Sequence, residues 1–240
     1  MTRGRSRLGL IACFSAMVLG GAVTGAAAAV CDPDGMQASG AVYRICMPEP
    51  GRWNGRLFVW AHGYVAFNEP IAIPENQLRL PDGTLLPDLI TSLGFAFATS
   101  SYSVNGLAVR QGLADVVDLV NIFNAIKGPV QKVYLVGASE GGLITTLGVE
   151  RHPDVFSGGL AVCGPIGSFP LQVNYIGDFR VVFAKALYSG SFRRLLAIPV
   201  DRYGHCNFTS DEVLTAFGAL VVKAEGGGLS GVSSAVEGPE

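Results

Sequence analysis

Short, uninterrupted apolar runs alternate along the chain with longer stretches in which apolar residues recur at helical spacing. The run at 57–61 contains no polar residue before His62 and Gly63, which is typical of a strand buried on both faces of a sheet. The stretch 109–126 repeats apolar residues every three or four positions, as an amphipathic helix does. The same reasoning predicts further strands at 41–47, 95–99, 131–137, 159–163 and 195–200 and further helices at 85–93, 140–151 and 210–222.

This alternation predicts the fold class. Buried strands separated by amphipathic helices form an α/β fold with a mostly parallel sheet and helices on both of its faces. The strand 41–47 is expected at an edge of the sheet, with Pro48 and Pro50 ending it, and Ser210 is expected to cap the last helix. Such sheets bind their ligands beyond the carboxyl ends of the strands, so that is where candidate residues are sought.

The start of the chain has the pattern of a secretory signal peptide. Three arginines among the first seven residues precede an apolar run and an alanine cluster, and cleavage is expected after Ala29 or Val30. A lipoprotein with Cys31 as the lipidated residue is disfavoured, because bulky Val30 stands where a small residue is expected. No later segment is long enough to span a membrane. The chain therefore divides into a signal peptide, 1–29, one α/β domain, 30–225, and a tail rich in Gly and Ser that is expected to be disordered, 226–240.

The charge balance of the secreted chain limits its partners. Cleavage removes three arginines and leaves 14 basic against 19 acidic residues, a net charge of −5. Such a chain offers no basic surface for nucleic acid or anionic lipid. The expected partner is a small neutral or apolar molecule.

Four cysteines remain after cleavage, and an even number in an exported protein favours disulfides. Cys31 and Cys46 are close in sequence and would clip the N-terminal strand, while Cys163 and Cys206 lie near the ends of two predicted strands. The sequence by itself leaves all three pairings open. It contains no CxxC pair or histidine cluster, so no metal site is predicted.

The strongest indication of a catalytic residue is the motif Gly-Ala-Ser-Glu-Gly at 137–141. It is a G-x-S-x-G between a predicted strand and a predicted helix. A sharp turn there forces the serine backbone into a strained conformation, and the glycines let neighbouring backbone approach closely. The hydroxyl of Ser139 would then stand at a helix N-terminus, where unpaired N–H groups favour a developing negative charge. The motif therefore predicts a nucleophilic serine.

Three segments together resemble the secreted serine hydrolases of the α/β-hydrolase family. They are the strand–GASEGG–helix unit, the segment WAHGY at 60–64 and the segment YGHC at 203–206, and the similarity runs from about residue 57 to residue 220. The resemblance implies an α/β-hydrolase fold and acyl transfer without cofactor or metal. It also implies two backbone donors for the oxyanion: the N–H of Glu140 and a second one from Gly63 or Tyr64.

Three histidines are candidates for the general base. His152 ends the helix after Ser139 and lies a helix length away from it, and His62 is expected to be a turn residue bonded to nearby backbone. His205 follows the last predicted strand, at a carboxyl end beside the serine, where an imidazole can accept the serine proton and deliver it to the leaving group. A disulfide between Cys163 and Cys206 would hold this histidine in register.

The third member of the triad is the weak point of the resemblance. Family order places the acid between the serine and the histidine, where Asp178 is the best candidate and a surface position in a lid-like segment is the alternative. The interval is short for the family, and 184–194 marks a suspected deletion. Without an acid, the imidazole would be poorly oriented and turnover would fall by about 10⁴-fold, on the serine-protease precedent.

The sequence therefore predicts a secreted or periplasmic serine hydrolase that cleaves carboxylic esters with Ser139, His205 and Asp178. One alternative is a catalytically impaired protein of the same fold that lacks the acid. Another is an amidase or peptidase that uses the same site.

Overall fold

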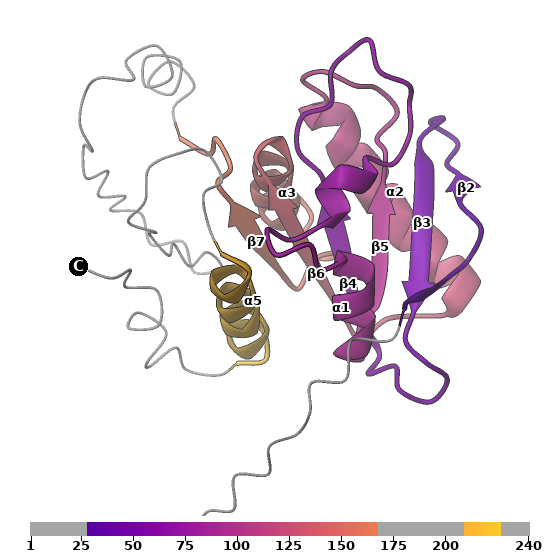
Figure 1. Cartoon of the computed structure of the whole chain (residues 1–240), viewed down its shortest axis with the longest axis vertical. Helices are drawn as coiled ribbons and strands as arrows, with labels where there is room; N and C mark the ends of the chain where they lie inside the picture. Colours follow the sequence, from indigo (N-terminus) through magenta and orange to yellow (C-terminus); the bar gives the residue numbers. More distant parts are fainter. Residues whose placement is uncertain (1–27, 168–208, 227–240) are drawn as a thin grey trace, which may run out of the picture.

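A seven-stranded sheet runs through the computed structural model of the chain, which describes residues 28–167 and 209–226 (Figure 1). The strand order is β1-β3-β5-β4-β6-β7, with β2 paired to β3. The strands are β1 (Val30–Cys31), β2 (Gly35–Met36), β3 (Val42–Met47), β4 (Arg56–Ala61), β5 (Ala96–Ser100), β6 (Lys132–Ala138) and β7 (Gly158–Val162). The helices are η1 (Glu75–Leu78), α1 (Leu86–Ser92), α2 (Val109–Lys127), α3 (Glu140–Arg151) and α5 (Ser210–Ala224).

The central strands are parallel, whereas β1, β2 and β3 run antiparallel to their neighbours. All five residues of β5 are buried, as are five of the six in β4. Strands this apolar form only where both faces are covered, because alternate side chains point to opposite faces.

Two helical layers cover the two faces of the sheet (Figure 1). Leu57, Val59 and Ala61 of β4 point into one core, which they share with α2 and α3. Phe58 and Trp60 point into the other, which they share with α1 and α5. The predicted fold class, an α/β fold with a mostly parallel sheet and helices on both of its faces, is thereby confirmed.

Most predicted elements within the described residues are confirmed to within two residues, and the bounds of α3 agree with the prediction. Two predictions are wrong. The strand at 41–47 is not an edge, because the two-residue strands β1 and β2 pair along its outer side. The cap of α5 is Thr209 and not Ser210, because Thr209 and Glu212 stand at the spacing of a capping box and bond reciprocally. The strand predicted at 195–200 and almost all of the predicted signal peptide and tail lie outside the described residues.

Candidate active site

Ser139 lies at the turn between β6 and α3, at the carboxyl edge of the sheet. Its backbone has φ 55° and ψ −119°, a conformation that a residue with a Cβ rarely adopts. The turn is held from both sides. The Ser139 N–H donates to the carbonyl of Val162 at 3.0 Å, and the Ser139 carbonyl accepts from the N–H of Gly142 at 3.0 Å. The predicted sharp strand-to-helix turn is present.

The two glycines of the motif permit the close approach that this turn requires. A Cβ at Gly137 would lie 2.3 Å from the carbonyl oxygen of Gly141, and a Cβ at Gly141 would lie 2.0 Å from the carbonyl oxygen of Ala61. Real Cβ atoms do not come so near to backbone oxygens. Glycine at 137 therefore lets the first turn of α3 pack against the end of β6, and glycine at 141 lets it pack against the end of β4.

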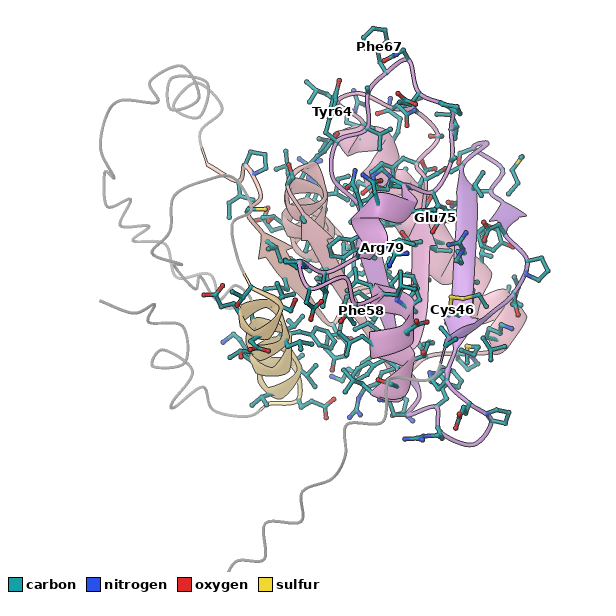
Figure 2. The ribbon with its side chains drawn as sticks, in the orientation of Figure 1. Cys46, Phe58, Tyr64, Phe67, Glu75 and Arg79 are labelled. Carbon is teal, nitrogen blue, oxygen red and sulfur yellow. A yellow bond between two sulfur atoms is a disulfide. The ribbon has the colours of Figure 1, made fainter. Side chains whose placement is uncertain are left out.

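The loop that follows β4 passes beside the serine. A Cβ at Gly63 would lie 3.3 Å from the Cβ of Ser139, so the backbone of Gly63 is a direct neighbour of the predicted nucleophile. Tyr64 follows, half exposed, where the loop rises above the carboxyl ends of the strands (Figure 2). The structure thus brings Gly63 beside Ser139, and the predicted site residues Tyr64 and Glu140 follow these two directly in the chain.

The ring and the carbonyl of His62 both make contacts that hold this loop in place. Its Nδ1 lies 2.7 Å from the carbonyl oxygen of Gly63, and its ring stacks on Tyr102 with 3.9 Å between centroids. The hydroxyl of Tyr102 donates to the His62 carbonyl at 2.9 Å. Burial lowers the pKa of His62, which is only 2% exposed, and therefore favours the neutral ring. Bonding of His62 to nearby backbone was expected, whereas the sequence gives no sign of the part played by Tyr102.

Gln77 is a second residue that the sequence analysis does not identify. It belongs to η1, and its side-chain amide bonds to the same loop. Its Oε1 accepts from the N–H of Gly63 at 2.7 Å, and its Nε2 donates to the carbonyl of Tyr64 at 3.2 Å. No periodic pattern or motif surrounds Gln77 in the sequence, so only the folded arrangement reveals it.

The carboxylate of Glu140 contacts the start of α2. It is buried and accepts from the backbone N–H of Ala108. Burial raises the pKa of Glu140, and the bond from Ala108 opposes part of that shift. Since Glu140 is the first residue of α3, its own N–H belongs to the group that a helix leaves without an internal partner.

A cavity of about 300 Å³ opens beside Ser139, on the sheet face covered by α1 and α5. Its rim includes Ser139, Gly63, Gln77 and Arg79, and most of its remaining lining is apolar. Figure 2 labels two of the lining residues, Phe58 on β4 and Arg79 after η1. The apolar lining comes from the sheet, from α1 and from α5: Phe58, Trp60, Val136, Leu86, Leu89, Ile90, Val213, Leu214 and Phe217. The site therefore joins a serine hydroxyl to a space suited to an apolar group.

The remaining predicted site residues are only partly placed. Cys31 and Cys46 form a disulfide, and Cys163 is also disulfide-bonded. His205, Asp178 and Cys206 lie outside the described residues, so their roles stay predictions. His152 ends α3, a helix of 12 residues, and so lies about 18 Å from its start.

The described residues offer neither a cluster of metal ligands nor a membrane-spanning helix. They contain no group of three or more His, Cys, Asp or Glu side chains that could hold a metal ion. None of their helices is both long and apolar enough to cross a membrane.

Three solved structures illustrate what the chain is similar to. LipA from Xanthomonas oryzae, a rice cell wall degrading esterase, matches in a ligand-bound form with 18% identity and a TM-score of 0.41 over 60% of this chain and 42% of its own. A putative dipeptidyl aminopeptidase IV from Bacteroides ovatus matches with 17% identity and a TM-score of 0.42 over 57% of this chain and 21% of its own. Brefeldin A esterase, a bacterial homologue of human hormone sensitive lipase, matches with 13% identity and a TM-score of 0.40 over 62% of this chain and 45% of its own.

The match spans less than half the length of each of these proteins. A likeness this distant gives no information about the activity of this chain. No family model matches the sequence, and no curated protein sequence matches it.

Proposed function

We propose that this protein is a secreted serine hydrolase that cleaves carboxylic esters carrying an apolar group. The observation that carries the proposal is the position of Ser139. It lies on a strained turn at the start of α3, directly beside the backbone of Gly63 and on the rim of an apolar cavity. These three features together suit a nucleophile, and a surface serine needs none of them.

In the proposed mechanism the Oγ of Ser139 attacks the ester carbonyl carbon while His205 accepts the hydroxyl proton. The carbonyl oxygen becomes an oxyanion, which accepts hydrogen bonds from the Glu140 N–H and from a donor at Gly63 or Tyr64. Collapse of this intermediate breaks the bond to the leaving alcohol, which takes the proton from His205 and leaves an acyl-serine. Water then attacks the acyl-serine with His205 again as base, and the carboxylic acid departs as Ser139 recovers its proton.

The proposal for His205 has one support in the described residues. Val213 and Leu214, near the start of α5, line the same cavity as Ser139. His205 stands four positions before the helix cap Thr209, a stretch of chain that can reach about 14 Å. Asp178 remains the proposed acid because no other carboxylate between Ser139 and His205 has a better position in the sequence.

The test is hydrolysis of p-nitrophenyl butyrate together with labelling by a fluorophosphonate probe. Wild-type protein should do both, and Ser139→Ala should do neither while keeping the wild-type melting temperature. Ser92→Ala, an exposed serine at the end of α1, is the matched control and should behave as wild type. Folded wild-type protein that neither turns over the ester nor accepts the probe would favour the impaired alternative.

A second comparison separates esterase from amidase. Matched p-nitrophenyl ester and p-nitroanilide substrates with the same acyl group should differ strongly in kcat/KM, with the ester faster. Faster turnover of the anilide would favour the amidase or peptidase alternative.

Secretion is part of the proposal. The disulfide between Cys31 and Cys46 supports it, since such bonds persist in oxidising compartments. N-terminal sequencing of the exported protein should begin at Val30 or at Cys31. A chain that keeps its initial methionine and stays in the cytoplasm would contradict it.

A further inference from the structure

The loop from His62 to Tyr64 has nearly all of its backbone polar groups engaged. The His62 carbonyl accepts from the Tyr102 hydroxyl, and the Gly63 carbonyl lies 2.7 Å from the His62 ring nitrogen. The Gly63 N–H and the Tyr64 carbonyl are both held by the amide of Gln77. Among the described residues, no hydrogen bond engages the N–H of Tyr64.

This pattern separates the two candidates for the second oxyanion donor. An N–H that already donates to a side-chain carbonyl at 2.7 Å must lose that bond before it can donate to substrate, and a lost bond to a partly buried group costs about 1 kcal/mol or more. The Tyr64 N–H has no bond to lose. Donors that stabilise an oxyanion are effective because they are fixed in place beforehand.

We infer that Gln77 is a positioning residue. Its amide occupies the Gly63 N–H, fixes the Tyr64 carbonyl and thereby keeps the Tyr64 N–H in place as the loop's donor to the oxyanion. The inference rests on the proposed function, since an oxyanion forms only if Ser139 attacks a carbonyl.

Gln77 is itself well anchored. Its backbone N–H donates to the carbonyl of Pro74 at 2.9 Å, and the next residue, Leu78, is only 1% exposed within the core under α1. A side-chain amide carries an acceptor oxygen and a donor nitrogen on the same carbon, so it can bond at the same time to an N–H and to a carbonyl of one loop. Gln77 therefore links η1 to the loop after β4 at two points.

The first test removes the amide. Gln77→Ala should lower kcat for p-nitrophenyl butyrate about tenfold and leave KM within about threefold, because the misplaced donor matters mainly in the transition state. Asn76→Ala, the exposed neighbour on η1, is the control and should keep the wild-type kcat. A Gln77→Ala protein that is as fast as wild type or faster would overturn the inference, and a faster one would mean that the amide blocks the place of the substrate carbonyl.

The second test removes the donor itself. Tyr64→Pro deletes the N–H, and its kcat should be about 100-fold or more below that of Tyr64→Ala, which changes the side chain and keeps the N–H. If Gln77 acts through this donor, adding Gln77→Ala to Tyr64→Pro should cause no further loss. Equal kcat values for Tyr64→Pro and Tyr64→Ala, or fully additive losses, would contradict the inference.

A third variant does not depend on whether the proline is tolerated. The protonated carboxyl of Gln77→Glu can accept and donate as the amide does, but the ionised carboxylate can only accept. At pH 8, where this carboxyl is ionised, the kcat of Gln77→Glu should be about tenfold or more below that of wild type, and a kcat equal to that of wild type would refute the two-point contact. Fluorophosphonate labelling of the wild type separates the two failures: without labelling the proposed function fails, and with labelling only the assignment of Gln77 can fail.

Discussion

The cavity beside Ser139 should set the length of acyl chain that the protein prefers. Its volume of about 300 Å³ has room for about ten methylene-sized groups, if each takes about 30 Å³ as a water does in the liquid. Each methylene that leaves water contributes about 0.8 kcal/mol, which is about fourfold in kcat/KM. In a series of p-nitrophenyl esters from acetate to laurate, kcat/KM should therefore rise with chain length and level off near eight to ten carbons.

A substitution on α5 should move this limit. Val213 is partly buried and lines the cavity, and Val213→Phe adds about four carbons to the side chain, so the plateau should begin about four carbons earlier. Val222→Phe makes the same change at a position on α5 that is 45% exposed and outside the lining, and it should leave the series unchanged. A series that is flat in the wild type, or that shifts equally in both variants, would refute the assignment of the cavity to the acyl group.

Two further predictions concern stability. Gly137→Ala should lower the free energy of unfolding by about 1–3 kcal/mol in urea titrations, because its Cβ would lie 2.3 Å from the Gly141 carbonyl oxygen. Gly218→Ala is the control, on the exposed side of α5 with nothing within 4 Å. It should raise the free energy of unfolding by about 0.5–1 kcal/mol. The raised pKa of Glu140 means that its contribution to stability is fully present below the ordinary value of 4.5 and is lost as the pH rises through the folded-state value. Glu140→Gln should therefore lose less stability than wild type between pH 4 and pH 7, and parallel curves would show that Glu140 does not titrate in this way.

The sequence was sufficient for the central fold because the information lies in local patterns. The helix at 140–151 starts where a strained serine turn must end and stops before Pro153, so both of its bounds could be read. The strands β1 and β2 were missed because two residues carry no measurable alternation, and they form only by pairing with β3. Ser210 is the first helical residue and not the cap, because the capping box that Thr209 forms with Glu212 starts the helix one residue earlier.

The sequence identifies the site residues that belong to a short motif, and it does not identify those that reach the site only because distant segments meet in the fold. Ser139 and the loop at Gly63 and Tyr64 follow from short motifs, and the structure places them side by side. Gln77 lies in a stretch without periodicity, and its importance arises from the approach of η1 to a loop 13 residues earlier. The roles of His205 and Asp178 remain predictions from chain order.

The two faces of the sheet differ in function, and each is covered by its own layer of helices. α2 and α3 pack against the face that holds the serine turn in shape, whereas the cavity lies entirely on the side of α1 and α5. The partly buried side chains of Leu89, Val213 and Leu214, which line the cavity, can therefore change in size without contact with the strained backbone on which the chemistry depends. A protein built in this way can acquire a new substrate range through a few exchanges in one layer, while the other layer keeps the reactive group in place.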